Sequence, residues 1–303
     1  MIDLKLIRDN PDLVRAGILK KQGDPALVDR ILEKDLERRT ALQQVETLRA
    51  EQNRASKEVP RLQGEERERR TAELRDLSSR LKGLEADLAA IERALETLLL
   101  LVPNPPHESV PPGRDERDNV TLRTWGAPPK FDFPPLDHVD LGRRLGIFDL
   151  ERGAKVSGSR FYFLRGAGVL LEQALTRFSL DLLRREGFTL VTTPMLIRTE
   201  VILGAMGGDR IDDQQVYRIV DEDLGLIGTS EHAMLGMFKD EVLEETQLPI
   251  RLAGLSWCFR REAGSWGKDV RGIYRVHQFE KVEMFSFCHP DRSWEEHEYL
   301  LSR

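Results

Sequence analysis

The chain has 303 residues, of which 32% are charged and 40% hydrophobic, and its formal net charge is −6. This length allows about two domains with a sizeable core, and the composition excludes a disordered chain. The longest aliphatic run, residues 98–102, is too short to span a membrane, and the charged start has no signal-peptide core. We therefore expect a cytoplasmic globular protein with no membrane partner. Its two cysteines, Cys258 and Cys288, fit a reducing compartment.

The first hundred residues predict helices, two of them long. Asn-Pro-Asp at 10–12 is typical of a helix start. Residues 27–59 and about 65–101 are dense in Glu, Arg, Leu and Ala, and the segment between them contains Pro and Gly. The second segment keeps apolar residues at strict heptad spacing over 74–98, and the first segment has the same spacing. The two segments predict an antiparallel coiled-coil hairpin roughly 50 Å long, at about 1.5 Å per residue.

Charge is distributed unevenly along this predicted hairpin. Its outer half, residues 49–82, has ten Lys and Arg against seven Asp and Glu, whereas the stem, 27–48 with 83–100, has five against nine. Most coiled coils only join protein chains, and that function does not require a basic end. Exposed Lys and Arg are the side chains that bind nucleic-acid phosphates. The candidates for phosphate contacts are Arg54, Lys57, Arg61, Arg67, Arg69, Arg70 and Arg75.

The middle of the chain predicts a linker followed by mixed structure. Residues 103–135 are rich in proline and have no periodicity, which indicates an interdomain connector. A short helix is expected at 136–145 and a strand at 155–164. An amphipathic helix is expected at 170–186, and a strand that ends at Pro194 follows it.

Residues 228–232 read Gly-Thr-Ser-Glu-His, after a predicted Ile/Leu strand and before a helical run expected at 233–245. A Thr/Ser/Glu turn before a helix is most often only an N-cap. We assign no role to His232. His277 and His289 are expected to be structural because they have no metal-ligand spacing.

Residues 255–287 predict two antiparallel strands joined by a long loop at 263–272. In the first run Arg260 and Glu262 share a face. In the second run one face extends over roughly 26 Å, at about 3.3 Å per residue, and carries arginine, aromatic and carboxylate groups. That pattern fits an elongated ligand such as a nucleotide with an amine-bearing substrate, but an exposed sheet face can look the same without a ligand. The face of the second run consists of Arg275, His277, Phe279, Lys281 and Glu283.

The run FRREAGSWGKDVRGIYRVHQFEKVE, starting at Phe259, resembles motif 2 of class II aminoacyl-tRNA synthetases in its seryl-tRNA synthetase form. The helix and strand at about 170–194 resemble motif 1, which implies a homodimer through these elements. The basic hairpin resembles the arm with which this family grips the long variable arm of tRNA(Ser). The resemblance implies an α+β fold, with a long antiparallel α-helical coiled-coil arm and an antiparallel β-sheet domain flanked by helices. The expected limits are 1–102 for the tRNA-binding domain with its arm at about 27–101, 103–135 for the linker, and 136–303 for the core with motif 2 at about 255–287.

The resemblance also implies an activity, serine–tRNA ligase, and a role for each matching residue. In this reaction L-serine is activated with ATP and Mg²⁺ and is then transferred to the 3′-terminal adenosine of tRNA(Ser). The chain has no P-loop motif, so ATP would be bound in another way, and we expect no metal ligand in this chain. Arg260 is expected to contact the α-phosphate, Glu262 the adenine edge and Arg275 the terminal phosphate. Phe279 would stack on adenine, and Glu283 would bind the serine part of the substrate. The implied sets are Thr229, Ser230, Glu231, Arg260 and Glu283 for serine, and Arg260, Arg261, Glu262, Arg275, Val276 and Phe279 for ATP.

The last residues predict a helix that opens with a capping box of Ser293 and Glu296 and reaches Arg303 within about three turns. Family members continue with a Mg²⁺-binding acid and motif 3, and this chain contains neither. We therefore expect a C-terminally incomplete core that is weak or inactive in adenylation. The alternative is a truncated or paralogous protein that has no catalytic activity and only binds tRNA.

Overall fold

The computed structural model describes residues 2–206, 215–262 and 271–303. These residues form two compact units, which divide between residues 124 and 125, inside the predicted linker. The first unit is helical and the second mixes helices with three small sheets, which confirms the predicted α+β class. Within the described ranges no helix is long and apolar enough to cross a membrane.

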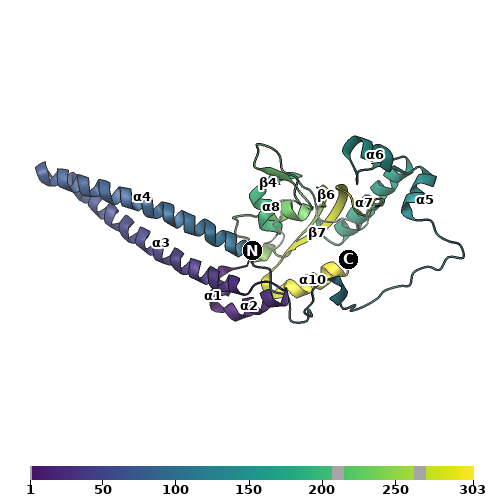
Figure 1. The fold of residues 1–303 in the computed structure, drawn as a ribbon, viewed down its shortest axis with the longest axis horizontal. Coiled ribbons are helices and arrows are strands. Elements are labelled where there is room, and N and C mark those ends of the chain that lie inside the picture. Colours follow the sequence, from purple (N-terminus) through teal and green to yellow (C-terminus); the bar gives the residue numbers. More distant parts are fainter. Residues whose placement is uncertain (1, 207–214, 263–270) are drawn as a thin grey trace. The chain divides into compact units, whose positions relative to one another are not determined.

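The first unit contains the predicted long hairpin (Figure 1). Pro11 opens the second helix, at a position where the missing N–H of proline costs nothing. The long helices end within one or two residues of the predicted limits, and a single short turn connects them. The elements are α1 (Leu4–Asp9), α2 (Pro11–Lys20), α3 (Ala26–Glu58), η1 (Val59–Arg61) and α4 (Gly64–Leu100).

The hairpin is held together at the predicted heptad positions. Val45, Leu48 and Leu81 are buried between the two helices. Gln52 interrupts the apolar series of α3, and its Nε2 donates a hydrogen bond to Ser78 Oγ at 2.7 Å. The heptad pattern therefore correctly predicts both the partner helix and the face that it covers.

A buried carboxylate joins α1 to the start of the hairpin. The Asp35 side chain is fully buried, and Arg8 donates to its two oxygens at 2.8 and 2.6 Å. Arg39 and Arg38 approach the same carboxylate at 3.1 and 3.6 Å. Burial alone would raise the pKa of Asp35, but Arg8, and after it Arg39 and Arg38, hold this pKa below its usual value. Asp35 is therefore ionised in the folded protein.

The second unit is organised around β6 and β7, which pair antiparallel from Ile250 opposite Phe287 to Phe259 opposite Gln278. Strand β3 runs parallel to β6 on its other edge, and β1–β2 and β4–β5 form two small antiparallel sheets. The elements are α5 (His138–Leu145), β1 (Phe148–Asp149), α6 (Leu150–Ser157), β2 (Phe163–Leu164), α7 (Ala167–Arg185), β3 (Thr189–Thr192), β4 (Leu196–Arg198), α8 (Thr199–Met206), β5 (Leu224–Leu226), α9 (Ser230–Gly236), η4 (Glu245–Gln247), β6 (Ile250–Phe259), β7 (Gln278–Phe287), η5 (Pro290–Arg292) and α10 (Ser293–Leu301).

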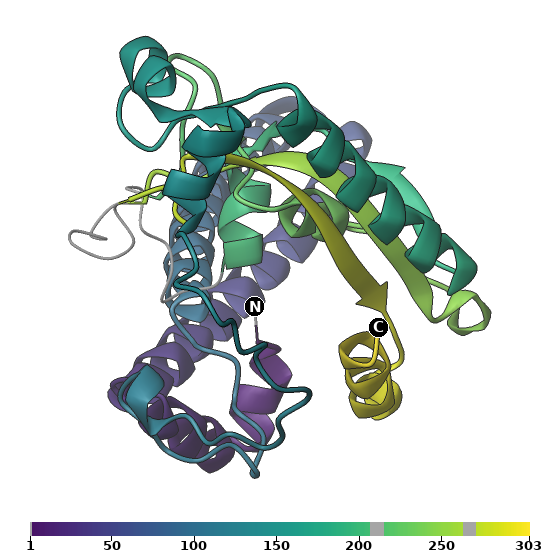
Figure 2. The same ribbon diagram turned by 90° about the vertical axis from the view of Figure 1, so that its right-hand side faces the viewer.

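The two faces of the β6–β7 ribbon have different partners. Helix α7 lies along one face (Figure 2), where Ala253, Val282 and Met284 pack with Leu183 and Phe188. Helix α9 packs against the opposite face, where the Ser230 hydroxyl donates to the carbonyl of Gly254. The α7 face is therefore apolar around Ala253, Val282 and Met284, and the α9 face carries Lys281 and Glu283.

Two predicted elements are wrong. Residues 155–164 are not one strand, because Asp149 caps a helix that continues to Ser157 and only Phe163 and Leu164 are extended. The helical run expected at 233–245 begins earlier, at Ser230, and ends at Gly236. Asp240 beyond it has φ 62, in the left-handed region that a right-handed helix cannot include.

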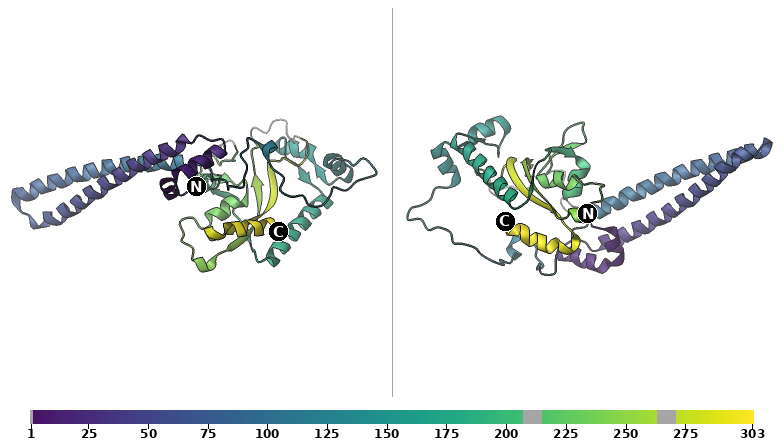
Figure 3. Two further views of the ribbon diagram at one scale, coloured as in Figure 1. Left: turned by 90° about the horizontal axis from the view of Figure 1, so that it is seen from below. Right: turned by 180° about the vertical axis from the view of Figure 1, so that it is seen from behind.

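The end of the chain also departs from expectation. Strand β7 begins at Gln278, so Arg275 precedes the strand instead of belonging to it. Helix α10 follows β7 as predicted (Figure 3), but its N-cap residue is Arg292 and no side chain caps it. The predicted capping box is wrong because the Glu296 carboxylate accepts hydrogen bonds from Arg251, at 2.6 and 2.8 Å, and from Ser286 at 2.9 Å. Two partly buried tertiary partners outcompete the helix terminus for this carboxylate.

Candidate functional site

The loop before α9 meets the polar face of β7 through Thr229. The Thr229 hydroxyl donates to Glu283 Oε2 at 2.6 Å and accepts from Lys281 Nζ at 3.0 Å. Lys281 and Glu283 also form an ion pair. The same hydroxyl accepts from the backbone N–H of Glu231 at 3.3 Å, so Thr229 is an N-cap as well. The N-cap interpretation and the ligand interpretation of this turn are therefore compatible.

Arg260 lies at the end of β6, beside this loop. Its Nε donates to the carbonyl of Gly228 at 3.1 Å, and its guanidinium carbon lies 5.2 Å from the centre of the Phe279 ring. The side chain is exposed and makes no ion pair with the residues that the structure describes. Arg260 is thus a positioned cation whose charge is available to an anionic group.

Glu262 and Arg275, both predicted to contact ATP, meet each other. Arg275 Nη1 donates to Glu262 Oε2 at 2.7 Å. Arg275 Nε is buried and has no hydrogen-bond partner in the described part of the chain. The backbone of Glu262 has φ 50, which is uncommon for a residue with a side chain. This turn brings the carboxylate to the arginine that precedes β7.

The remaining predicted site residues differ in how exposed their side chains are. Ser230 is fully buried and faces Gly254, so its hydroxyl does not reach the polar surface. Val276 is also buried, Glu231 lies in the first turn of α9, and Arg261 is exposed. The loop expected at 263–272 lies largely outside the described residues, which resume at Arg271.

The structure adds His232 to this site. It is buried, and its Nδ1 has no hydrogen-bond partner among the residues described. Burial lowers the pKa of His232 to about 4, and the charges of Arg260 and Lys281 act in the same direction, whereas Glu283 opposes them. The imidazole is therefore neutral at pH 7. The sequence does place His232 in the first turn of a helix, next to the predicted serine-binding residues. It could not show that this side of the helix faces β7.

Gly254 allows α9 to approach the sheet. An added Cβ there would lie 2.8 Å from Met234 Sδ and 2.8 Å from Ser230 Oγ. We expect Gly254→Ala to lower the free energy of unfolding by about 1–3 kcal/mol, because the added methyl group must displace α9. Urea denaturation measures this. Gly83→Ala is the control, since nothing lies within 4 Å of a Cβ at this helical position. Equal stability of Gly254→Ala and the unmodified protein would contradict the close approach.

The carboxylates of the polar face are already paired with cations. Glu262 binds Arg275 and Glu283 binds Lys281. Throughout the described ranges no group of three or more His, Cys, Asp and Glu side chains could hold a metal ion. The face can therefore offer arginines to phosphates and a carboxylate to an ammonium or hydroxyl group.

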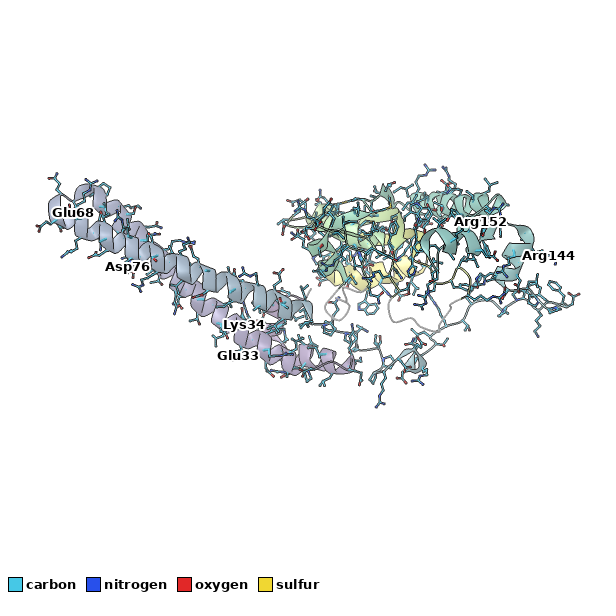
Figure 4. The ribbon with its side chains drawn as sticks, turned by 45° about the horizontal axis from the view of Figure 1, so that its top comes forward. Glu33, Lys34, Glu68, Asp76, Arg144 and Arg152 are labelled. Atoms are coloured by element: carbon cyan, nitrogen blue, oxygen red, sulfur yellow. The ribbon has the colours of Figure 1, made fainter. Side chains whose placement is uncertain are left out.

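The basic side chains of the arm differ in their availability. Arg70 is paired with Glu58 and Glu73 at 2.6 and 2.8 Å, and Arg69 lies 3.8 Å from Glu73. Figure 4 marks this outer part of the hairpin with Glu68 and Asp76 and its root with Glu33 and Lys34. Of the seven predicted phosphate contacts, those that are exposed and make no ion pair with a described residue are Arg54, Lys57, Arg61, Arg67 and Arg75.

Two family descriptions match this chain. The seryl-tRNA synthetase N-terminal domain matches residues 1–106, and the tRNA synthetase class II core domain (G, H, P, S and T) matches residues 216–302. The serine–tRNA ligase of Paenarthrobacter aurescens is 46% identical over 303 residues, covering 100% of this chain and 71% of that protein. The serine–tRNA ligase of Nocardia farcinica is 47% identical over 309 residues, with the same coverage of 100% and 71%.

Two solved structures are similar over the whole chain. The seryl-tRNA synthetase of Pyrococcus horikoshii, complexed with ATP, has a TM-score of 0.84 and 40% identity, covering 100% of this chain and 73% of that one. The cytoplasmic serine–tRNA ligase of Naegleria fowleri, in complex with AMP, has a TM-score of 0.79 and 30% identity, covering 100% and 71%. The similarity therefore extends over both compact units.

Proposed function

Because the chain belongs to the seryl-tRNA synthetase family, we infer that it is a serine–tRNA ligase, which activates serine with ATP and transfers it to the 3′-terminal adenosine of tRNA(Ser). One structural observation supports this inference most strongly. Arg260 with Phe279, and Thr229 with Glu283, are joined by direct contacts on the same face of β6 and β7. A cation beside an aromatic ring, next to a carboxylate, fits an aminoacyl-adenylate.

We propose that the arginines of this face bind the phosphates. A serine carboxylate is already ionised at pH 7, so its oxygen can attack the α-phosphorus, with pyrophosphate leaving, without a general base. The step needs positioning and neutralisation of negative charge. Arg260 would supply this at the α-phosphate, and Arg275 would bind the terminal phosphate in place of Glu262. Phe279 would stack on adenine, and the buried Val276 and the exposed Arg261 would belong to the same ATP site.

We propose that serine lies against Thr229, Glu231 and Glu283. Beside its contacts with Thr229 and Lys281, the Glu283 carboxylate would accept a hydrogen bond from the serine hydroxyl, and an analogue without that hydroxyl would lose this bond. Ser230 would act indirectly, because its bond to the Gly254 carbonyl fixes the turn. Lys281 would hold the Glu283 carboxylate in position, a role that their ion pair supports.

Mg²⁺ is expected with ATP, but the described carboxylates of this face do not fit the ion. Glu262 and Glu283 each have a cationic partner, and no cluster of acidic side chains lies beside them in the described ranges. The roles proposed above for the residues of this chain therefore involve no metal ion.

We propose a homodimer through α7 and β3. The outer side of α7 exposes Leu170, Leu171, Leu175 and Phe178, at 72, 57, 59 and 64% of their surface. An apolar stripe of this kind on a monomer is typical of an interface with another chain. We also propose a cytoplasmic location, which is compatible with two free cysteines.

Serine-dependent exchange between ATP and labelled pyrophosphate tests the proposed activity. Exchange that requires serine supports adenylation by this chain. If exchange is absent while tRNA(Ser) still binds, the non-catalytic tRNA-binding alternative is favoured, and adenylation by the 303 residues is refuted.

The outer cations of the arm are proposed to bind the variable arm of tRNA(Ser). We expect Arg54→Ala and Arg67→Ala each to reduce the slope of log affinity against log salt by about 1, because each removes a phosphate contact. Filter binding over a range of salt concentrations measures this slope. Lys34→Ala at the root is the control, since Lys34 is paired with Glu37 at 2.6 Å (Figure 4). A tRNA without the variable arm should bind the variants and the unmodified protein equally. An unchanged slope with intact tRNA(Ser) would refute the contact.

A further inference from the structure

A cavity lies on the α7 side of the sheet, away from the polar face described above. Its volume is about 130 Å³. Trp257 of β6 pairs with Glu280 of β7, and Glu280 accepts a hydrogen bond from Thr176 of α7 at 3.3 Å, which places these side chains beneath α7. The cavity is lined by Phe161, Tyr162, Leu164, Glu172, Trp257 and Gln278.

One carboxylate, that of Glu172, lines this cavity, and Glu280 lies close enough to act on its charge. Burial raises the pKa of Glu172, and the charge of Glu280 raises it further. Burial also raises the pKa of Tyr162, and the negative charges of Glu172 and Glu280 raise it further. Neither carboxylate has a cationic partner among the residues that the structure describes. Two like charges in a partly apolar environment are unfavourable unless a cation joins them.

The walls of the cavity suit a cation as well. Three of the six lining residues are aromatic, Phe161, Tyr162 and Trp257, and the face of an aromatic ring attracts an ammonium or guanidinium group. The volume corresponds to about four water molecules at about 30 Å³ each, which is enough for the head group of an amine. A neutral ligand would leave the carboxylates unpaired, and an anion would be repelled.

We propose that this cavity binds an organic cation, the ammonium or guanidinium end of an amine, between the aromatic rings and the carboxylates of Glu172 and Glu280. The site is separate from the proposed serine and ATP site and does not depend on it. The cation could be a lysine or arginine side chain of a second copy of this chain, or a free amine. Leu171 and Leu175, exposed on α7 beside Glu172 in the sequence, offer a surface on which a second copy could pack.

Binding of propylammonium chloride, with 1-propanol as its neutral analogue, tests the chemistry of the site. Because Trp257 lines the cavity, tryptophan fluorescence should change saturably with propylammonium but not with propanol, and Trp257→Phe should abolish the change. The double variant Glu172→Gln, Glu280→Gln should bind propylammonium at least about tenfold more weakly. Asp181→Asn is the matched control, because Asp181 lies on the same helix and is paired with Arg177. Thermal unfolding checks that each variant is folded.

Sedimentation equilibrium on the same variants distinguishes the two sources of the cation. If a second copy supplies it, the double Gln variant dimerises about tenfold more weakly, the control is unchanged, and propylammonium binds only the monomer. If the cation is a free amine, propylammonium binds at any protein concentration and dimerisation is unchanged. Equal binding of propylammonium and propanol, or no binding together with unchanged dimerisation, would overturn the proposal.

Discussion

Replacing Arg260 by alanine is expected to lower serine-dependent ATP–pyrophosphate exchange by about 100- to 1000-fold, the usual effect of removing a charge that stabilises a transition state. Arg260 is held by the Gly228 carbonyl and lies over Phe279, and in the described ranges no carboxylate neutralises it. Negative charge that develops at the α-phosphorus would lose this cation. Steady-state exchange kinetics should therefore show kcat and kcat/KM falling together.

Arg144→Ala is the control for this prediction. Arg144 is an exposed arginine of α5 in the same unit (Figure 4), and its loss should leave exchange unchanged. Because Arg260 is also exposed, the Arg260→Ala variant should unfold at the same temperature as the unmodified protein. If Arg260→Ala keeps full exchange activity, the proposed role in adenylation is wrong.

Replacing Asp35 by alanine is expected to destabilise the helical unit by about 1.5–3 kcal/mol, the usual contribution of hydrogen bonds to a charged group, because three partly exposed arginines lose their shared partner. Arg8, Arg38 and Arg39 all direct nitrogen atoms at this carboxylate. Asp29→Ala is the control, because its ion pair with Arg15 is solvent-exposed and its loss should change little. Helical circular dichroism during urea denaturation measures both effects.

The pH dependence of this difference has a definite sign. The pKa of Asp35 is lowered in the folded state, so its contribution to stability is complete above the pKa of an ordinary aspartate. It is lost as the pH falls through the lowered value. The unfolding free energies of the Asp35→Ala variant and the unmodified protein should thus differ at pH 7 and converge below about pH 4. A difference that stays constant down to pH 2 would show that Asp35 acts through packing.

The arm could be predicted from the sequence because its information is local. Heptad spacing identifies the helices, the face that each one buries and the turn between them, and the structure places Val45, Leu48 and Leu81 accordingly. Alternation along β7 likewise puts Lys281 and Glu283 on one face, where both contact Thr229.

Features that depend on tertiary partners could not be predicted. Glu296 has the spacing of a capping box, but Arg251, 45 residues earlier, binds its carboxylate. All three residues of the turn at 229–231 were expected to bind serine, but in the fold the Ser230 side chain is buried. The mutual pairing of Glu262 and Arg275 and the burial of His232 arise from segments that meet only in the folded chain.

The hydrogen bond between Gln52 and Ser78 limits how the two arm helices can slide past each other. Ser78 is exposed beside the apolar seam and meets the Gln52 amide in only one alignment, and the apolar contacts of the seam favour that same alignment. The separations between basic groups on opposite helices are therefore constant. An RNA duplex bound there would meet charges at fixed intervals, so discrimination among RNAs would depend on the dimensions of the duplex rather than on adjustment of the protein.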